Sequence, residues 1–508
     1  MKTEENNRFD GTKTFLKTET VFFWSIVCSF ALVWAVLPTL FHTGYRNDVI
    51  EILFIGKEWV PADAKHPALP SWLTEIVGLL TNRTFITPFL AGQFCTIVTV
   101  WSIWRLARFV LAEKHAMIAA FAILPFRLLT NESVLFNHNL VLLATCALSV
   151  FLVFQAFQTN RLPDWIAAGA AIGLALHSKY PSALLVVAIL LYMILRPAGR
   201  RHWFHAGPYV TTVVAFSIFL PHLIWLFNND FPTLTYISNT ASSRLQGNLW
   251  SHLVFPLRFA ASQPLYWMPA LVVLLPALGW PWTWKSGAIL HENTRAKECE
   301  RFLFYCSVIP FAVFLAVSAF GIHLRMVYGA PFWCFLSIWL MLRFQIRDHP
   351  RLLMKTVLCL VGVEAVIITG FIGEQFLGKP LAPAYLPMAV LSQECDRVWQ
   401  EQHFNVPCPY VTGDMILAGH AAYRMSNRPT VHKNGSTWSS DEDVNRYGGL
   451  VVWPMEGNSG RENAPSWVRE RFPGAKVLPP DTLVLSYPPL VQRRLPPLKV
   501  GIAVIPPP

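Results

Sequence analysis

Long runs of apolar residues alternate with short polar segments as far as about residue 373. A helix of roughly 20 apolar residues crosses the hydrocarbon core of a bilayer, because each residue rises about 1.5 Å. The runs therefore predict a polytopic helical bundle of about eleven membrane spans, although the third and fifth runs are short. These runs are residues 21–41, 84–106, 116–126, 140–157, 165–177, 182–195, 208–227, 265–282, 302–320, 327–342 and 353–372.

The pattern changes after residue 372, where apolar and polar residues mix as in a soluble protein. Short strand-like and helix-like segments alternate there, which is typical of a small α/β domain. We expect the Pro-rich tail, 488–508, to pack loosely. The chain thus divides into a bundle, 1–372, and an α/β domain, 373–508. The expected strands are 406–411, 450–453 and 482–486, and the expected helices are 415–426 and 465–472.

Lys and Arg are distributed unevenly between the predicted loops. One set of alternate loops, which includes the N-terminus, holds about twice as many as the other, and such an excess marks the cytoplasmic side. An odd number of spans then places the α/β domain outside, together with two long polar loops, 42–83 and 228–263. The first apolar run is expected to be a span rather than a cleaved signal peptide, because its leader is long and mixed in charge.

The composition agrees with a membrane protein. Only 14% of residues are charged and 54% are hydrophobic, whereas a soluble domain has about 25% charged residues. The net charge of +11 comes from short clusters between apolar runs, so it indicates topology rather than nucleic-acid binding. The nine cysteines lack metal-type pair spacing. We expect no cofactor, and a divalent metal is not indicated by the sequence but stays an open alternative.

Two features of the α/β domain leave alternatives open. Cys395 and Cys408 are its only cysteines, and they could pair if the domain faces an oxidising compartment or remain free if it does not. The acidic run 441–443 superficially resembles the metal-binding acids of nucleotide-sugar enzymes. Because serines precede it, a helix start is the favoured interpretation.

The first outside loop carries candidate catalytic groups. Asp48 and Glu51 are three residues apart, so on a helix they share a face along the membrane surface. A carboxylate there can act as a general base on an acceptor hydroxyl, although a solvated loop acid is the simpler interpretation. Lys65 precedes a rigid turn, HPALP, and is either a fixed cation for a phosphate or a lysine that extends to the membrane interface.

A second cation interrupts the apolar segment LALHSKYPSALL, residues 174–185. Lys179 lies at the outside end of a short helical hairpin, where it either binds a phosphate at headgroup depth or extends to the interface. Tyr180 follows it. Further polar residues are expected around the same outside cavity, and as a substrate-binding set they are His66, Glu132, His138, Asn139 and Arg325.

Taken together, three motifs resemble a known family. They are Asp48-x-x-Glu51, the segment KHPALP at 65–70, and the segment GLALHSKYP at 173–181. In this order they resemble the protein O-mannosyltransferase-like, polyprenyl-phosphate-dependent glycosyltransferases of the GT-C class. The resemblance is strongest to the bacterial inner-membrane branch that transfers galacturonic acid or aminoarabinose to lipopolysaccharide. Segment YVTGD, 410–414, is similar to the exported domain of the galacturonosyl members.

The resemblance implies a catalytic mechanism and a set of partners. Asp48 would be the base that activates the acceptor, with Glu51 beside it. Lys65 and Lys179 would hold the donor phosphate, flanked by Tyr180, and a single displacement would invert the anomeric carbon. The partners would be a polyprenyl-phosphate-linked sugar, a lipid or glycolipid acceptor and membrane lipids, with the α/β domain in the periplasm.

Two departures from the family pattern keep rival functions open. Many members have a second Asp after the third span, whereas this chain has Asn137, His138 and Asn139 there, and Ala68 replaces a frequent Pro. The rivals are a transporter of lipid-linked sugars and an inactive relative with the same fold. A transporter is expected to carry polar groups at mid-membrane on broken helices, whereas these polar groups cluster at the outside ends of the spans.

Overall fold

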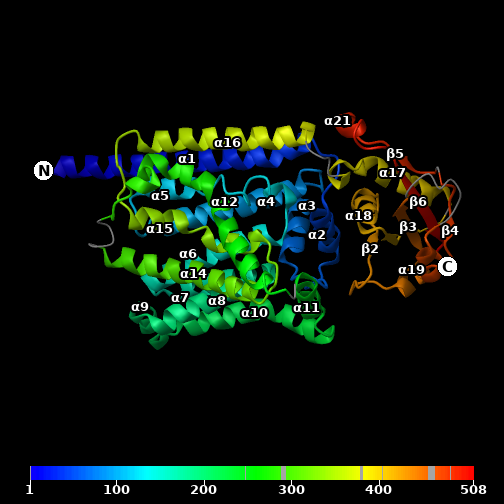
Figure 1. Ribbon diagram of the computed structural model, residues 1–508, viewed down its shortest axis with the longest axis horizontal. Helices are drawn as coiled ribbons and strands as arrows, with labels where there is room; N and C mark the ends of the chain where they lie inside the picture. The colour runs from blue at the N-terminus through cyan, green and yellow to red at the C-terminus, as the bar shows by residue number, and fades with distance from the viewer. Residues whose placement is uncertain are drawn as a thin grey trace.

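The computed structural model describes residues 2–245, 248–287, 293–377, 382–402, 404, 406–455, 464–480 and 482–508, with side chains from residue 18 onward. A long helical bundle and a smaller α/β domain lie end to end (Figure 1). The N-terminus lies at the end of the bundle far from the α/β domain (Figure 1). The predicted fold class, a helical membrane bundle with a C-terminal α/β domain, is confirmed.

Seven helices of the described chain are long and apolar enough to cross a membrane, and a bent helix pair at 182–204 can form an eighth span. The protein is therefore a multi-pass membrane protein. The count of eleven spans stays a prediction, because three predicted spans form shorter helices: α5 (Glu113–Phe121), α7 (Leu162–Ser178) and α15 (Leu336–Arg343). The long helices are α1 (Lys2–Val36), α4 (Thr87–Ala107), α6 (His138–Thr159), α10 (Gly207–Asn228), α12 (Ser251–Leu278), α14 (Thr294–Ala319) and α16 (Leu352–Leu377).

The remaining helices of the bundle are short. The bent pair consists of α8 (Ser182–Leu195) and α9 (Pro197–Arg200) with a following 3-10 turn.

Buried aromatic rings hold the centre together: Phe23 stacks on Trp104 and on Phe121, with centroids 4.1 and 5.8 Å apart. Helix α16 lies at the edge, and most of its apolar stretch faces outward, as expected for a surface in contact with lipid.

The first outside loop folds into α2 (Asn47–Glu58) and α3 (Leu69–Leu80), which lie at the end of the bundle nearest the α/β domain (Figure 1). Helix α11 (Pro232–Arg244) lies at the same end. Helix α2 belongs to both bodies. Ile50 packs into the bundle core, whereas Phe54 packs into the core of the α/β domain. This shared burial fixes the position of α2 between them.

The α/β domain contains a mixed sheet in the order β2-β1-β3-β6-β4, with β5 paired to β6. Strands β2, β1 and β3 are parallel, and β6 runs antiparallel to β3. The expectation of a loosely packed tail is wrong, because β6 is a buried strand in the middle of the sheet. The strands are β1 (Tyr410–Gly413), β2 (Thr430–His432), β3 (Gly449–Pro454), β4 (Lys476–Val477), β5 (Val484–Leu485) and β6 (Leu498–Ile505).

Helices cover both faces of this sheet, because alternate residues of a buried strand point to opposite sides. Val452 packs with α17 and α18, whereas Val451 packs with α19 and α20. Ser440 caps α19 in a capping box, which confirms a helix start at the acidic run. Cys395 and Cys408 are free thiols. The helices are α17 (Met388–Glu401), α18 (Met415–Arg424), α19 (Asp441–Tyr447), α20 (Ser466–Arg471) and α21 (Pro489–Gln492).

Candidate active site

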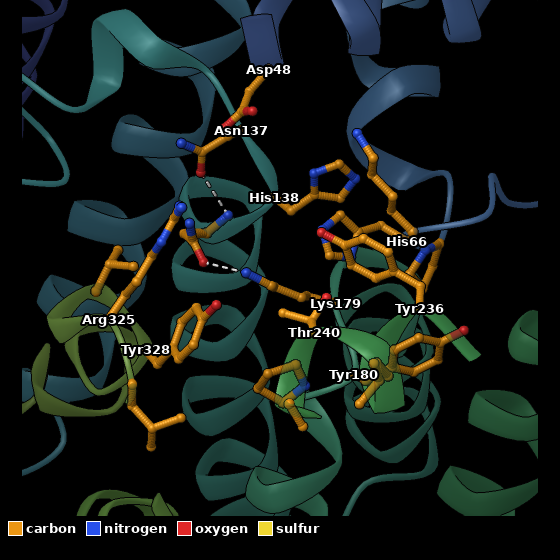
Figure 2. Close-up of a pocket in the computed structure, with 18 of the residues that line it drawn as sticks. Asp48, His66, Asn137, His138, Lys179, Tyr180, Tyr236, Thr240, Arg325 and Tyr328 are labelled. Atoms are coloured by element: carbon orange, nitrogen blue, oxygen red, sulfur yellow. Dashed lines mark hydrogen bonds between the residues drawn. The ribbon is translucent and has the colours of Figure 1, made fainter. Parts of the chain in front are cut away.

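A cavity of about 580 Å³ opens at the end of the bundle that faces the α/β domain. It is lined by α2, the 59–68 loop, the start of α6, the turn between α7 and α8, α11 and the segment 322–328. Figure 2 shows polar side chains from these segments pointing into a common space. The structure brings nine of the ten predicted site residues to this cavity: Asp48, Glu51, Lys65, His66, His138, Asn139, Lys179, Tyr180 and Arg325.

Carboxylates line one side of the cavity. Asp48 lies in the first turn of α2 and is exposed, and its carboxylate makes no hydrogen bond or ion pair with the residues that the structure describes. Glu51 follows one turn later and is buried, and both of its oxygens lie 2.8 Å from Lys65 Nζ. This ion pair outweighs the effect of burial and raises the pKa of Lys65. Lys65 is therefore already partnered by a carboxylate.

Asp63, which sequence reasoning missed, organises the 59–68 loop. Its Oδ1 accepts hydrogen bonds from the backbone N–H groups of Lys65 and His66, at 2.9 and 2.7 Å. This local pattern is typical of an Asx turn and could have been recognised in the sequence Asp63-Ala-Lys65-His66. The turn places both side chains at the cavity wall.

The α/β domain also contributes a residue that sequence reasoning missed. Lys433 follows β2, and its Nζ donates to Glu51 at 2.7 Å and to Asp63 at 3.2 Å. Nothing in the local sequence could have indicated this contact, since it joins residues 382 and 370 positions apart. It depends wholly on how the two bodies dock.

Cations gather on another side of the cavity. Lys179 lies in the turn between α7 and α8, and its Nζ donates to Asn139 Oδ1 at 2.6 Å (Figure 2). Burial lowers the pKa of Lys179 to about 8, Asp48 opposes this shift, and Arg325 and Arg244 add to it. Lys179, Arg244 and Arg325 line one cavity together with Asp48.

Tyr328 lies between these cations. Its ring centroid is 5.0 Å from Lys179 Nζ, and its hydroxyl accepts a hydrogen bond from Arg244 at 2.9 Å. Sequence reasoning counted Arg244 only as a loop charge and missed Tyr328. Arg244 lies on α11 and Tyr328 lies in the segment 322–328, and both segments approach the turn between α7 and α8 only in the folded chain. Together these two residues separate the cations, which still line one cavity.

Three aromatic side chains, His66, His138 and Tyr180, also line the cavity. The rings of His66 and His138 lie 4.3 Å apart, and burial, followed by the charge of His138, lowers the pKa of His66 well below its ordinary value. Tyr180 donates to Thr233 at 2.7 Å and lies 2.8 Å from His222. Burial raises the pKa of Tyr180 to about 12. His66 and Tyr180 are therefore uncharged near pH 7.

One predicted site residue lies elsewhere. The structure does not place Glu132 at the cavity, contrary to the prediction. Its carboxylate pairs with Arg127 at 2.8 Å and accepts a hydrogen bond from the Tyr266 hydroxyl at 3.0 Å. The 3-10 turn that follows Glu132, residues Ser133–Leu135, separates it from the cavity residues at the start of α6.

This chain is similar to known proteins in both sequence and fold. Residues 65–225 match the family described as dolichyl-phosphate-mannose-protein mannosyltransferase. The lipopolysaccharide core galacturonosyltransferase RgtB of Rhizobium johnstonii is 23% identical over 435 residues, which cover 80% of this chain and 82% of that protein.

Two crystal structures of ArnT from Cupriavidus metallidurans share the fold. Each covers 96% of this chain and 98% of ArnT. The apo structure has a TM-score of 0.58 at 12% identity, and the structure bound to undecaprenyl phosphate has a TM-score of 0.55 at 14% identity. The chain thus shares the fold of ArnT, and it is similar in sequence to the mannosyltransferase family over residues 65–225 and to RgtB over most of its length.

Proposed function

We propose that this chain transfers a sugar from a polyprenyl-phosphate donor to an envelope glycolipid, in the lipid A or core region of lipopolysaccharide. The related RgtB is a lipopolysaccharide core galacturonosyltransferase, and ArnT has been crystallised with undecaprenyl phosphate. The observation that carries the proposal is the cavity, which sets an unpartnered carboxylate, Asp48, near three cations at one end of a membrane bundle.

In the proposed reaction, an acceptor hydroxyl attacks the anomeric carbon of the donor sugar. Its proton passes to Asp48, and the bond between the anomeric carbon and the phosphate oxygen breaks as the new glycosidic bond forms. The polyprenyl phosphate leaves with that electron pair, and the configuration at the anomeric carbon inverts. Because negative charge develops on the phosphate, fixed cations stabilise the transition state more than the ground state.

The cations divide into two groups in this proposal. Lys179, Arg244 and Arg325 hold the donor phosphate, since no carboxylate forms an ion pair with them among the described residues. Lys65 was expected to bind phosphate directly. Its ion pair with Glu51 instead supports a role in orienting that carboxylate beside Asp48. The sugar lies against three aromatic side chains of the cavity wall, Tyr180, His66 and His138.

The proposed location is the periplasmic side of a bacterial inner membrane. The excess of Lys and Arg in the N-terminal set of loops supports a cytoplasmic N-terminus. The N-terminus and the α/β domain lie at opposite ends of the long axis (Figure 1), which supports a periplasmic α/β domain. The cavity would then open where a lipid-linked donor meets the periplasm.

The rival transporter has less support. A transporter site is expected near the middle of the membrane, whereas this cavity is lined by helix ends, outside loops and part of the 59–68 loop. The arrangement favours chemistry at the membrane surface over passage through the bundle.

Purified protein in detergent, given a polyprenyl-phosphate sugar and a lipopolysaccharide acceptor, tests the proposal. We expect release of polyprenyl phosphate in proportion to glycosylated acceptor, both quantified by mass spectrometry. A panel of donors, including galacturonic acid and aminoarabinose, covers the sugars of the resembling branch. Absence of turnover with every donor, from protein that still binds polyprenyl phosphate, would contradict a transferase and favour the inactive relative.

A further inference from the structure

Two buried carboxylates of the site come from different segments. Glu51 lies on α2 and Asp63 lies in the 59–68 loop, and their side chains are only 10% and 8% exposed. Two buried carboxylates near each other repel, and each is expensive to hold ionised without a cation. Lys433 Nζ contacts both, so a single ammonium group lies between them.

Lys433 is itself well fixed. Its side chain is 12% exposed, and its Nζ also lies 5.5 Å from the ring centroid of Trp438. The preceding residue, His432, is bound to the sheet, since the hydroxyl of Thr412 donates to its carbonyl at 3.0 Å. The ammonium group is therefore presented from a rigid edge of the sheet.

The segment that leads to Lys433 begins at Arg428, and this end of it is anchored to the bundle. Arg428 donates two hydrogen bonds to Glu75 of α3, at 2.9 and 3.0 Å. Lys57 of α2 donates to the carbonyl of Arg428 and, at 3.3 Å, to Thr430. Arg428 also has a φ of 47°, which is unusual for a residue other than Gly and persists only where its surroundings hold it.

A close helix contact supports the same docking. A Cβ at Gly419 of α18 would come within 2.8 Å of the Ile50 side chain on α2, so a larger residue would push the helices apart. The N–H of Tyr45, just before α2, donates to His420 of α18 at 2.8 Å. These contacts set the distance between α2 and α18 of the α/β domain.

We propose that Lys433 is a positioning residue through which the α/β domain completes the active site. It bridges Glu51 and Asp63, and this bridge fixes the 59–68 loop with Lys65 and His66 at the cavity wall. Lys433 acts through these carboxylates and not on the substrate. The inference rests on the proposed glycosyl transfer, and it makes transfer depend on a docked α/β domain.

Three variants of the full-length protein test this role. Lys433→Met keeps the length of the side chain but removes the ammonium, and Lys433→Arg keeps a cation. Lys476→Met, at an exposed position on β4, is the matched control. Each is assayed for kcat, for the donor KM and for the stoichiometry of polyprenyl phosphate binding by isothermal titration.

We expect Lys433→Met to lower kcat about 100-fold, since misplacing catalytic groups by about 1 Å has effects of that order. The donor KM should change less than about threefold, because Lys179 and Arg244 keep their own hydrogen bonds to Asn139 and Tyr328. Binding stoichiometry should stay at the parent value. Lys433→Arg should recover most of the activity, and Lys476→Met should match the parent.

Three outcomes overturn the inference. They are a kcat of Lys433→Met within about threefold of the parent, a fall in binding stoichiometry that parallels the loss of activity, and a failure of Lys433→Arg to recover activity. The second result would assign Lys433 to folding alone. An inactive parent protein would instead sink the proposed function, so the two failures are distinguishable.

Discussion

His432 ends β2 and Lys433 follows it, yet these two neighbours belong to different charged clusters. Lys433 contacts Glu51 and Asp63, two residues of the cavity wall, whereas His432 joins a network inside the α/β domain. His432 Nε2 lies 2.7 Å from Asp441, and its Nδ1 lies 2.9 Å from Ser439 Oγ. Arg471 donates to both oxygens of Asp441, at 2.6 and 2.8 Å.

The two clusters differ in whether their charges are satisfied within the protein. In the α/β domain each ring nitrogen of His432 and each oxygen of Asp441 has a partner, and none of these residues lines the cavity. That network ties α19 and α20 to the sheet. In the cavity, Asp48 has no such partner among the described residues, and Lys179 contacts only uncharged groups there, the Asn139 amide and the Tyr328 ring. Unsatisfied charge around open space indicates a ligand, whereas a closed network indicates structure.

The sharpest test of this comparison is Asp48→Asn. The amide cannot accept the acceptor proton, so we expect kcat to fall about 1000-fold, within the range for loss of a general base. Expression and polyprenyl phosphate binding should be unchanged, because Asp48 holds no other side chain in place. Transfer is measured as released polyprenyl phosphate.

Asp230→Asn is the matched control for that change. Asp230 is an exposed acid in another outside loop, and its left-handed backbone, with a φ of 56°, suits Asn equally well. It should transfer at the parent rate. An active Asp48→Asn protein would show that a different group accepts the proton.

The next effect concerns the charge of Lys179. Its pKa, lowered by burial to about 8, means that the ammonium is present below about pH 8 and lost above it. We expect the donor Kd of the parent to weaken about tenfold between pH 7 and about pH 9, as the phosphate loses one cation. In Lys179→Arg the guanidinium stays charged, so the Kd should be nearly constant over this range. Equal pH dependence in both proteins would remove Lys179 from the phosphate site.

A smaller effect on activity is expected from Glu75→Gln at the interface between the bundle and the α/β domain. Glu75 is 5% exposed in its side chain and pairs with Arg428 and Arg83. Removing one partner of a buried ion pair costs about 3 kcal/mol. Amide hydrogen exchange should therefore accelerate in α18 and β2, and kcat should fall less than in Lys433→Met.

Glu470→Gln gives the control for this interface variant. Glu470 is an exposed acid on α20, on the other side of the sheet from α18. Its substitution should leave both exchange and transfer unchanged. If Glu75→Gln also left exchange in β2 unchanged, the interface would not depend on this ion pair.

The smallest effect is expected for Asp441→Asn in the closed network. Hydrogen bonds from Arg471 and then from His432 hold the pKa of Asp441 below its ordinary value. Its ionised form therefore stabilises the fold above about pH 4, and this contribution is lost as the pH falls further. The variant should lose about 1 kcal/mol at neutral pH, measured by denaturant unfolding, and should keep transfer within about twofold of the parent. A large loss of transfer would mean that the closed network serves catalysis.

Much of the candidate site could be predicted because its residues fall in local motifs. Asp48 and Glu51 share a helix face by spacing alone, and Lys179 stands out because a cation interrupts an apolar run. Glu132 misled the prediction because a polar residue in an outside loop can pair with its own neighbours, as it does with Arg127. Asp63 was missed, although the Asx-turn pattern that it begins could have been recognised in the sequence.

The buried tail shows the same limit in the fold. Residues 498–505 were expected to pack loosely because prolines surround them, yet β6 pairs with three other strands. Gly501 allows the Trp453 ring to lie against that strand, since a Cβ there would meet the ring at 2.1 Å. Such pairing depends on strands distant in sequence, so local composition underestimates it.

The sequence by itself determined that this is a membrane bundle with an α/β domain, and it determined most of the residues at the cavity, because hydropathy and short motifs act over a few turns of chain. Only the tertiary structure decided that Arg244 joins them, that Lys433 contacts Glu51 and Asp63, and that Lys65 is already paired with Glu51. Electrostatic partners are set by distance in space, and residues hundreds of positions apart become neighbours only when α2 is buried between the two bodies.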